Sequence, residues 1–164
     1  MQRVAITGMG AICALGRTVP EVAASLCQGR AGIAPIESTD CSQLRFQNGA
    51  EVRGYSHQPY FEDRRADFMD RFAQFAVIAA REAVACAGIE WTPELRERAA
   101  IITGSCVGGQ STEDIGFHEV YKLGHNRVHP LTIPKTMANA GASHISMEFG
   151  ITGPSFTIST ACSS

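Results

Sequence analysis

The sequence lacks the features that mark several broad classes of protein. Its 164 residues carry a formal net charge of only −2, and only 18% of them are charged. We therefore expect no nucleic-acid partner and no anionic membrane surface as a partner. No apolar run approaches the roughly 18 residues that a membrane-spanning helix needs. The first residues, MQRVAITGMG, lack the pattern of a secretion signal, so we expect a soluble, cytoplasmic protein.

Paired cysteines and metal-ligand spacings are also missing. Six cysteines are scattered along the chain without a C-x-x-C pair, which favours free and mostly buried thiols over disulfides. His118, His125 and His129 are close in sequence, but glycine and proline flank the last two, so one helix face cannot present both. We expect no metal and no cofactor.

The order of predicted elements indicates an α/β protein with a mainly parallel sheet, organised as one domain over residues 1–164. Apolar, β-rich runs predict strands, and Ala99 to Thr103 is apolar enough for a strand buried on both faces. Capping residues and apolar stripes predict the helices. The predicted strands are 3–7, 50–52, 99–103 and 155–160, and the predicted helices are 18–29, 70–88, 94–98, 111–123 and 134–149.

Two glycine-rich segments follow predicted strands, and each has two interpretations. GMGAIC, after the first strand, is similar to a dinucleotide-binding loop that uses Gly8 and Gly10, but Cys13 replaces the third glycine of that fingerprint. We favour the structural interpretation, in which these glycines form a tight turn. GSCVGG, residues 104–109, lacks the Lys-Ser/Thr ending of a P-loop. It is either closely packed backbone or a substrate-facing loop at the carboxyl end of its strand.

The segment ISTACSS carries the most chemical information. A strand ends, small residues follow, and a helix should begin at or just after Cys162. This order is typical of a nucleophile elbow, in which the positive end of the helix dipole stabilises a thiolate and backbone N–H groups bind an oxyanion. The other interpretation, a buried structural cysteine, stays equally open on spacing alone.

At this motif the chain resembles the N-terminal half of the β-ketoacyl-acyl carrier protein synthases, which are condensing enzymes of the thiolase-like fold. The resemblance extends over VAITGMGAICALG, DRFAQFAVIAAREA, IITGSCVGG and the long stretch HPLTIPKTMANAGASHISMEFGITGPSFTISTACSS. It implies a mixed five-stranded sheet with helices on both faces. It also implies decarboxylative condensation of an acyl thioester with malonyl-carrier protein, in fatty-acid or polyketide synthesis.

The resemblance implies a role for individual residues. Cys162 matches the acyl acceptor, whose own backbone N–H is one oxyanion donor. Val107 matches a wall of the acyl pocket, and Leu131 and Thr132 match positions that reach across a dimer interface. Thr132 replaces the aromatic residue of many relatives, so the acyl chain length is not implied. Arg64 and Arg65 match the site where the acyl carrier protein docks, although Asp67 and Phe68 replace residues that are often basic.

The family's second half supplies two catalytic histidines, a lysine and a further oxyanion donor, and no histidine follows Cys162 here. We therefore expect a chain truncated just after the active-site cysteine and inactive by itself. The resemblance also implies a homodimer paired along SFTIST. A non-catalytic fragment or partner that binds the carrier protein is the alternative function.

Overall fold

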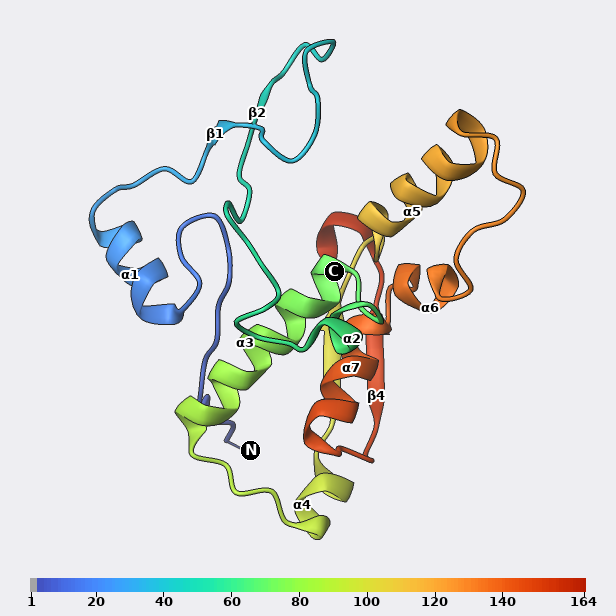
Figure 1. Ribbon diagram of the computed structural model, residues 1–164. Coiled ribbons are helices and arrows are strands. Elements are labelled where there is room, and N and C mark those ends of the chain that lie inside the picture. The colour runs from blue at the N-terminus through green and yellow to red at the C-terminus, as the bar shows by residue number, and fades with distance from the viewer. Residues whose placement is uncertain (1–2) are drawn as a thin grey trace. The chain divides into compact units, whose positions relative to one another are not determined.

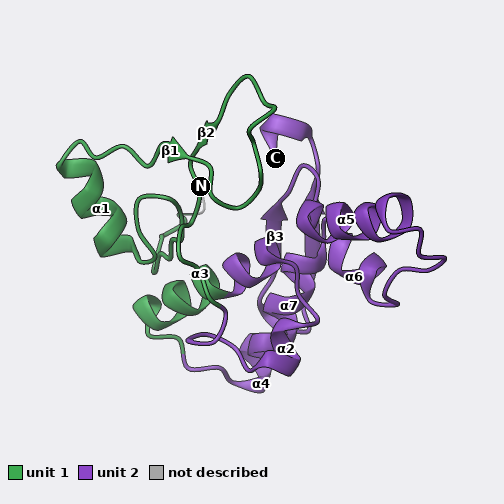
Figure 2. Cartoon of the chain, turned by 45° about the horizontal axis from the view of Figure 1, so that its top comes forward, with its two compact units in different colours: residues 1–56, 78–89 green, residues 57–77, 90–164 purple. Residues whose placement is uncertain are grey.

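The computed structural model describes residues 3–164, which form two compact units. Within the described residues, the first comprises 3–56 and 78–89, and the second comprises 57–77 and 90–164 (Figure 2). The longest helix, α3 (Arg71–Ala87), contributes its first part to the second unit and its remainder to the first.

The first unit contains helix α1 (Val19–Cys27) and a short antiparallel pair, β1 (Ala34–Pro35) with β2 (Asn48–Gly49) (Figure 1). Helix α1 begins where the sequence predicts, because the Thr18 hydroxyl accepts a hydrogen bond from the Glu21 amide at 3.4 Å and proline occupies the first turn.

The glycines of GMG in this unit pack against the alanine-rich part of α3. A Cβ on Gly8 would lie 2.1 Å from the carbonyl oxygen of Ala83, and one on Gly10 would lie 1.9 Å from that of Ala79. Only glycine permits this approach of backbone to helix. These contacts support the structural interpretation of the two glycines and give the dinucleotide-binding interpretation no support.

The strand predicted over residues 3–7 does not form in the described part of the chain. Val4 and Ile6 are 95% and 85% exposed, and no neighbouring strand pairs with this segment. A β-rich run becomes a strand only where a partner completes its hydrogen-bond ladder.

The second unit carries the remaining elements in an alternating order. Its helices and strands are α2 (Asp63–Ala66), α4 (Pro93–Arg98), β3 (Ile101–Gly104), α5 (Gln110–Phe117), the π-helix η1 (His118–Lys122), α6 (Thr132–Thr136), α7 (Ala140–Phe149), β4 (Ser155–Ile158) and the 3₁₀ turn η2 (Ala161–Ser163). The single helix predicted over 134–149 is divided between α6 and α7, because Met137 adopts an extended backbone with ψ 133°.

Strands β3 and β4 pair in parallel, with Ile101 opposite Ser155 and Gly104 opposite Ile158. Helix α7 packs on this pair, and the adjoining core is built on Ile101, Ala142 and Ile151. A parallel pair joined through helices confirms the predicted α/β class.

The larger sheet of the prediction differs from the structure. The described residues form two two-stranded sheets instead of one mixed five-stranded sheet. Strand β3 is not buried on both faces either, because Ile102 is 68% exposed while Ile101 is buried. The side chains of Ile102, Phe156 and Ile158 stand exposed on alternate positions of the pair, so helices on both faces are not formed there.

All six cysteines are free, as predicted, but the expected burial is wrong. Cys41 is half-buried and the other five are exposed. In the described residues 3–164, no helix has the length and hydropathy needed to cross a membrane.

Candidate active site

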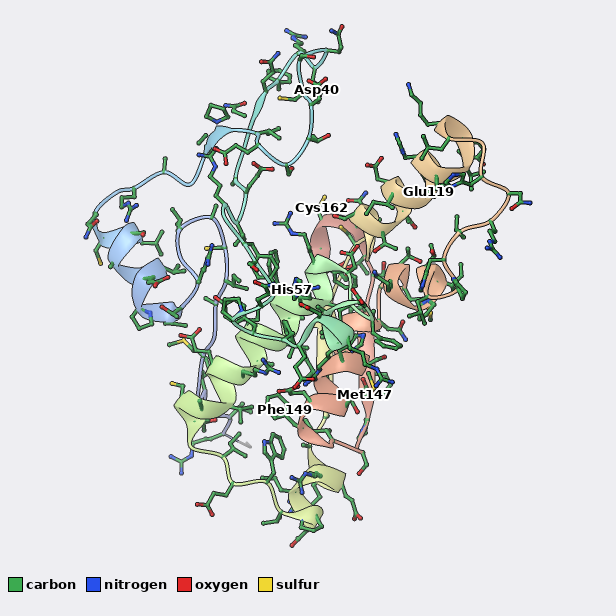
Figure 3. All side chains as sticks on the ribbon, viewed as in Figure 1. Asp40, His57, Glu119, Met147, Phe149 and Cys162 are labelled. Atoms are coloured by element: carbon green, nitrogen blue, oxygen red, sulfur yellow. The ribbon has the colours of Figure 1, made fainter. Side chains whose placement is uncertain are left out.

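Cys162 lies in the turn η2, directly after strand β4 (Figure 3). Its side chain is exposed, and in the described residues its backbone N–H makes no hydrogen bond within the chain. The preceding residue, Ala161, has a φ of 51° and is the one non-glycine residue with positive φ in the described chain. Such a conformation costs an alanine free energy, so the surrounding structure imposes a sharp turn at the position where the sequence predicts an elbow.

The turn folds back onto the end of the neighbouring strand β3. The Thr160 amide donates to the Ser164 hydroxyl at 2.7 Å, and a Cβ on Gly104 would lie 2.5 Å from the Ser164 carbonyl carbon. The helix expected to begin at Cys162 is a single 3₁₀ turn over Ala161–Ser163 in this structure.

The loop 105–109, which follows β3, runs beside this turn. The parallel ladder continues past the strands, since the Ser105 amide donates to the Ile158 carbonyl at 3.1 Å. The Ser159 hydroxyl then donates to the Cys106 carbonyl at 3.4 Å. The carboxyl ends of β3 and β4 therefore meet, which is the edge where α/β sheets place their ligands.

Loop 105–109 carries Val107, which is 44% exposed, and it is fixed by contacts with α6. The Gly109 amide donates to the Thr136 carbonyl at 3.1 Å. Gly108 has a φ of 95°, and a Cβ there would lie 2.2 Å from the same carbonyl oxygen. These contacts support the closely packed backbone that the sequence allowed, and the loop lies at the carboxyl end of β3.

Leu131 and Thr132 lie at the beginning of α6. Thr132 lines a groove of about 860 Å³ between α5, α6 and the segment 125–130, together with Thr112 and Lys135. Val107, Leu131 and Cys162 do not line this groove, so the structure brings Thr132 and Val107 onto adjoining segments but not into one described cavity.

The two arginines predicted to receive a carrier protein differ in their surroundings. Arg65 forms an ion pair with Glu148 of α7, and its guanidinium lies 5.8 Å from the ring centroid of Phe61. Arg64 is exposed and forms no ion pair in the described part of the chain. The Arg64 side chain is therefore accessible to a partner surface, whereas Arg65 already forms an ion pair within the unit.

Sequence analysis missed Asp70, a buried carboxylate at the beginning of α3. Its position just before a helix could have suggested a cap. Its contacts with Thr112, 42 residues further along the chain, leave no signal in the sequence.

The histidines considered as metal ligands form no site: across residues 3–164, no three His, Cys, Asp or Glu side chains gather as ligands.

Comparison with known proteins extends over the whole chain. The family model described as "Beta-ketoacyl synthase, N-terminal domain" matches residues 1–164. The 3-oxoacyl-[acyl-carrier-protein] synthase 2 of Vibrio cholerae is 32% identical over 98% of this chain and 39% of its own length. The chloroplastic 3-oxoacyl-[acyl-carrier-protein] synthase I of Arabidopsis thaliana is 29% identical over 98% of this chain and 35% of its own length.

Solved structures agree with this result. The ishigamide ketosynthase/chain length factor superposes with a TM-score of 0.84 at 28% identity, covering 94% of this chain and 39% of that one. A β-ketoacyl synthase from Burkholderia phymatum superposes with a TM-score of 0.76 at 24% identity, covering 98% and 40%, and shows the same fold. The chain spans about two-fifths of the length of the relatives that it matches. With a family model that matches all 164 residues, the chain belongs to the β-ketoacyl synthase family and corresponds to its N-terminal domain.

Proposed function

We propose that Cys162 is the acyl acceptor of a β-ketoacyl synthase that makes carbon–carbon bonds in fatty-acid or polyketide synthesis in the cytoplasm. The observation that carries the proposal is the strained turn at Ala161, which precedes an exposed cysteine at the carboxyl end of a parallel strand. This geometry supports the interpretation of the turn as a nucleophile elbow. The free backbone N–H of Cys162 serves as one donor to the oxyanion that forms during acyl transfer.

The chemistry has two steps. The Cys162 thiolate attacks the thioester of an acyl carrier protein, so that a new thioester forms on the cysteine and the carrier thiol leaves. Malonyl-carrier protein then loses CO₂, and its carbanion attacks the acyl-cysteine to give a β-ketoacyl-carrier product and the free thiol. The names of the relatives, 3-oxoacyl-[acyl-carrier-protein] synthases, support this substrate class. Neither step needs a metal or another cofactor.

The remaining predicted residues take supporting roles in this proposal. Val107 walls the acyl pocket from the loop beside Cys162, and Leu131 and Thr132, at the beginning of α6, reach across the dimer interface to line the pocket of the partner subunit. Arg64 and Arg65 meet the carrier protein, with Arg64 making the direct contact because Arg65 is paired with Glu148. Both units act as one N-terminal domain, since one family model covers them.

We further propose a homodimer that pairs along SFTIST, so that the β3–β4 pairs of the two protomers form one continuous sheet. One edge of β4 has no strand partner within the described residues, and an unpaired edge is a ready template for pairing with a second strand.

Alkylation followed by peptide mapping tests the assignment of Cys162. After brief treatment with iodoacetamide at neutral pH, we expect Cys162 to be labelled before the other five cysteines. Five of the six cysteines, Cys162 included, are exposed, so accessibility alone does not favour one of them. Faster labelling of Cys86 or Cys106 would remove the physical basis for the nucleophile.

A substitution in the protein expressed from its full reading frame tests the function. Cys162→Ala should reduce transfer of an acyl group from carrier protein by at least about 10³-fold, as expected for loss of a nucleophile. Cys86→Ala is the matched control, because Cys86 is exposed on α3, and it should leave the rate unchanged. Acyl transfer that survives in Cys162→Ala would refute the proposal. Carrier binding without acyl transfer in the unmodified protein would instead favour the non-catalytic alternative.

A further inference from the structure

Asp70 is a charged residue buried to 5% exposure that pairs with no cation in the described part of the chain. Its carboxylate accepts hydrogen bonds from the Thr112 amide at 2.9 Å, from the Thr112 hydroxyl at 2.6 Å and from the Phe72 amide at 3.2 Å. A buried carboxylate is costly without such donors. The three bonds explain how it is tolerated, and they also show which elements it joins.

Asp70 caps two helices at once. The Phe72 amide lies in the first turn of α3, and the Thr112 amide lies in the first turn of α5. The residue that precedes α5, Gly109, has no side chain and makes no side-chain cap. Asp70 supplies that cap from the beginning of α3 instead. A carboxylate at two helix N-termini is also favoured by both helix dipoles.

The same contact fixes the end of loop 105–109. A Cβ on Gly109 would lie 3.1 Å from the Asp70 Cβ and 2.4 Å from the Lys135 carbonyl oxygen. The loop is therefore held between Asp70 on one side and α6 on the other. Its opposite end is tied to the turn of Cys162 by the bond between Ser159 and the Cys106 carbonyl.

We propose that Asp70 is a positioning residue, which sets the distance between the loop of Val107 and the acyl group on Cys162. The inference rests on the proposed function and deepens it, because it assigns control of acyl-chain selectivity to a residue that touches no substrate. Asp70 acts through Thr112 and Gly109. A small displacement of a pocket wall changes the rates for different substrates unequally.

The test compares Thr112→Val with Thr112→Ser in the protein expressed from its full reading frame. Valine removes the hydroxyl that donates to Asp70, and serine keeps a hydroxyl at the same position. Ser111→Ala is the control in the same helical turn, because Ser111 is exposed and its hydroxyl forms no hydrogen bond with the described residues. The rate of acyl transfer to Cys162 is measured for a short and a long acyl-carrier substrate, together with the melting temperature.

We expect Thr112→Val to change the ratio of the two rates by about tenfold, while Thr112→Ser and Ser111→Ala keep the wild-type ratio. A purely structural role would reduce the amount of folded protein and lower both rates equally, leaving the ratio unchanged. That outcome, with Cys162→Ala inactive as expected, would overturn the inference and leave the proposed function intact. If Thr112→Val folds poorly, Asp70→Asn replaces it, because asparagine keeps the shape of the side chain but loses one acceptor. The same change in the ratio of the two rates is then expected for Asp70→Asn.

Discussion

Two glycine-bearing segments follow β-rich runs in this chain, and they serve different purposes. Gly8 and Gly10 lie against the backbone of α3, where a Cβ on Gly10 would come within 1.9 Å of a helix carbonyl. Gly108 and Gly109 lie against the end of α6 in a loop that also touches the turn of Cys162. Neither Gly8 nor Gly10 has a positive φ, whereas Gly108 has a φ of 95°.

The difference teaches that a glycine after a strand-like run does not by itself indicate a ligand. In the first segment the glycines remove side chains so that a coil can approach a helix. In the second segment the glycines also permit a backbone conformation that other residues avoid, and this conformation turns the loop at the carboxyl end of a parallel strand. The local sequence therefore does not distinguish the two segments. They differ in the element that each glycine contacts, which is α3 for Gly8 and Gly10 and α6 for Gly108 and Gly109.

The largest expected effect on stability comes from Gly10→Ala. The added Cβ meets the Ala79 carbonyl oxygen in the middle of α3, and a continuous helix has little room to yield. We expect the free energy of unfolding to fall by about 3 kcal/mol or more, measured by urea denaturation.

Gly29→Ala is the matched control for Gly10→Ala. Gly29 has a φ of 64° and no atom within 4 Å of an added Cβ, so only the backbone conformation is penalised. We expect a loss of about 1 kcal/mol. Equal losses in the two variants would mean that the contact with α3 is not what selects glycine in GMG.

Gly108→Ala is expected to affect activity more than stability. The loop is shorter and less constrained than a helix, so it can shift to relieve the contact with the Thr136 carbonyl, at a cost of about 1–3 kcal/mol. That shift moves Val107 and reduces acyl transfer by about tenfold or more. Acyl-transfer assays and denaturation on the same preparation separate the two quantities. A variant that is destabilised but transfers acyl groups at the normal rate would place the loop outside the active site.

The sequence predicts those parts of the structure whose causes are local. Thr18 caps α1, Gly88 ends α3 with a φ of 62°, and the turn before Cys162 forms where small residues follow a strand. The ends of α1 and α3 depend on neighbouring residues only, whereas the surrounding structure imposes the positive φ of Ala161 in the turn. The resemblance to a family adds the proposed reaction, which no local pattern contains.

The remaining features depend on partners that are distant in sequence. The run at residues 3–7 has the composition of a strand but finds no partner strand, and Ile102 lies on the uncovered face of β3. Asp70 acquires its role only when Thr112 is brought to it by the fold. Hydrophobic periodicity cannot reveal which residue a buried carboxylate will meet.

The smallest expected effect is a dependence of stability on pH, which we expect in the second unit and not in the first. His144 lies on α7, which packs on β3 and β4. Burial lowers the pKa of His144, and Arg65 lowers it further, while a hydrogen bond to the backbone of Phe68 opposes the shift.

The folded-state pKa is thus below the ordinary value near 6.5, so the unfolded chain binds more protons in the interval between the two values. Stability contributed by neutral His144 is present above pH 6.5 and is lost as the pH falls through the folded-state pKa. Amide hydrogen exchange should therefore show β3 and β4 losing protection relative to α1 as the pH falls below 6.5, after correction for intrinsic rates. His144→Gln, which cannot titrate, should remove this difference. If the variant keeps the acid-dependent loss in β3 and β4, the titrating group lies elsewhere in the unit.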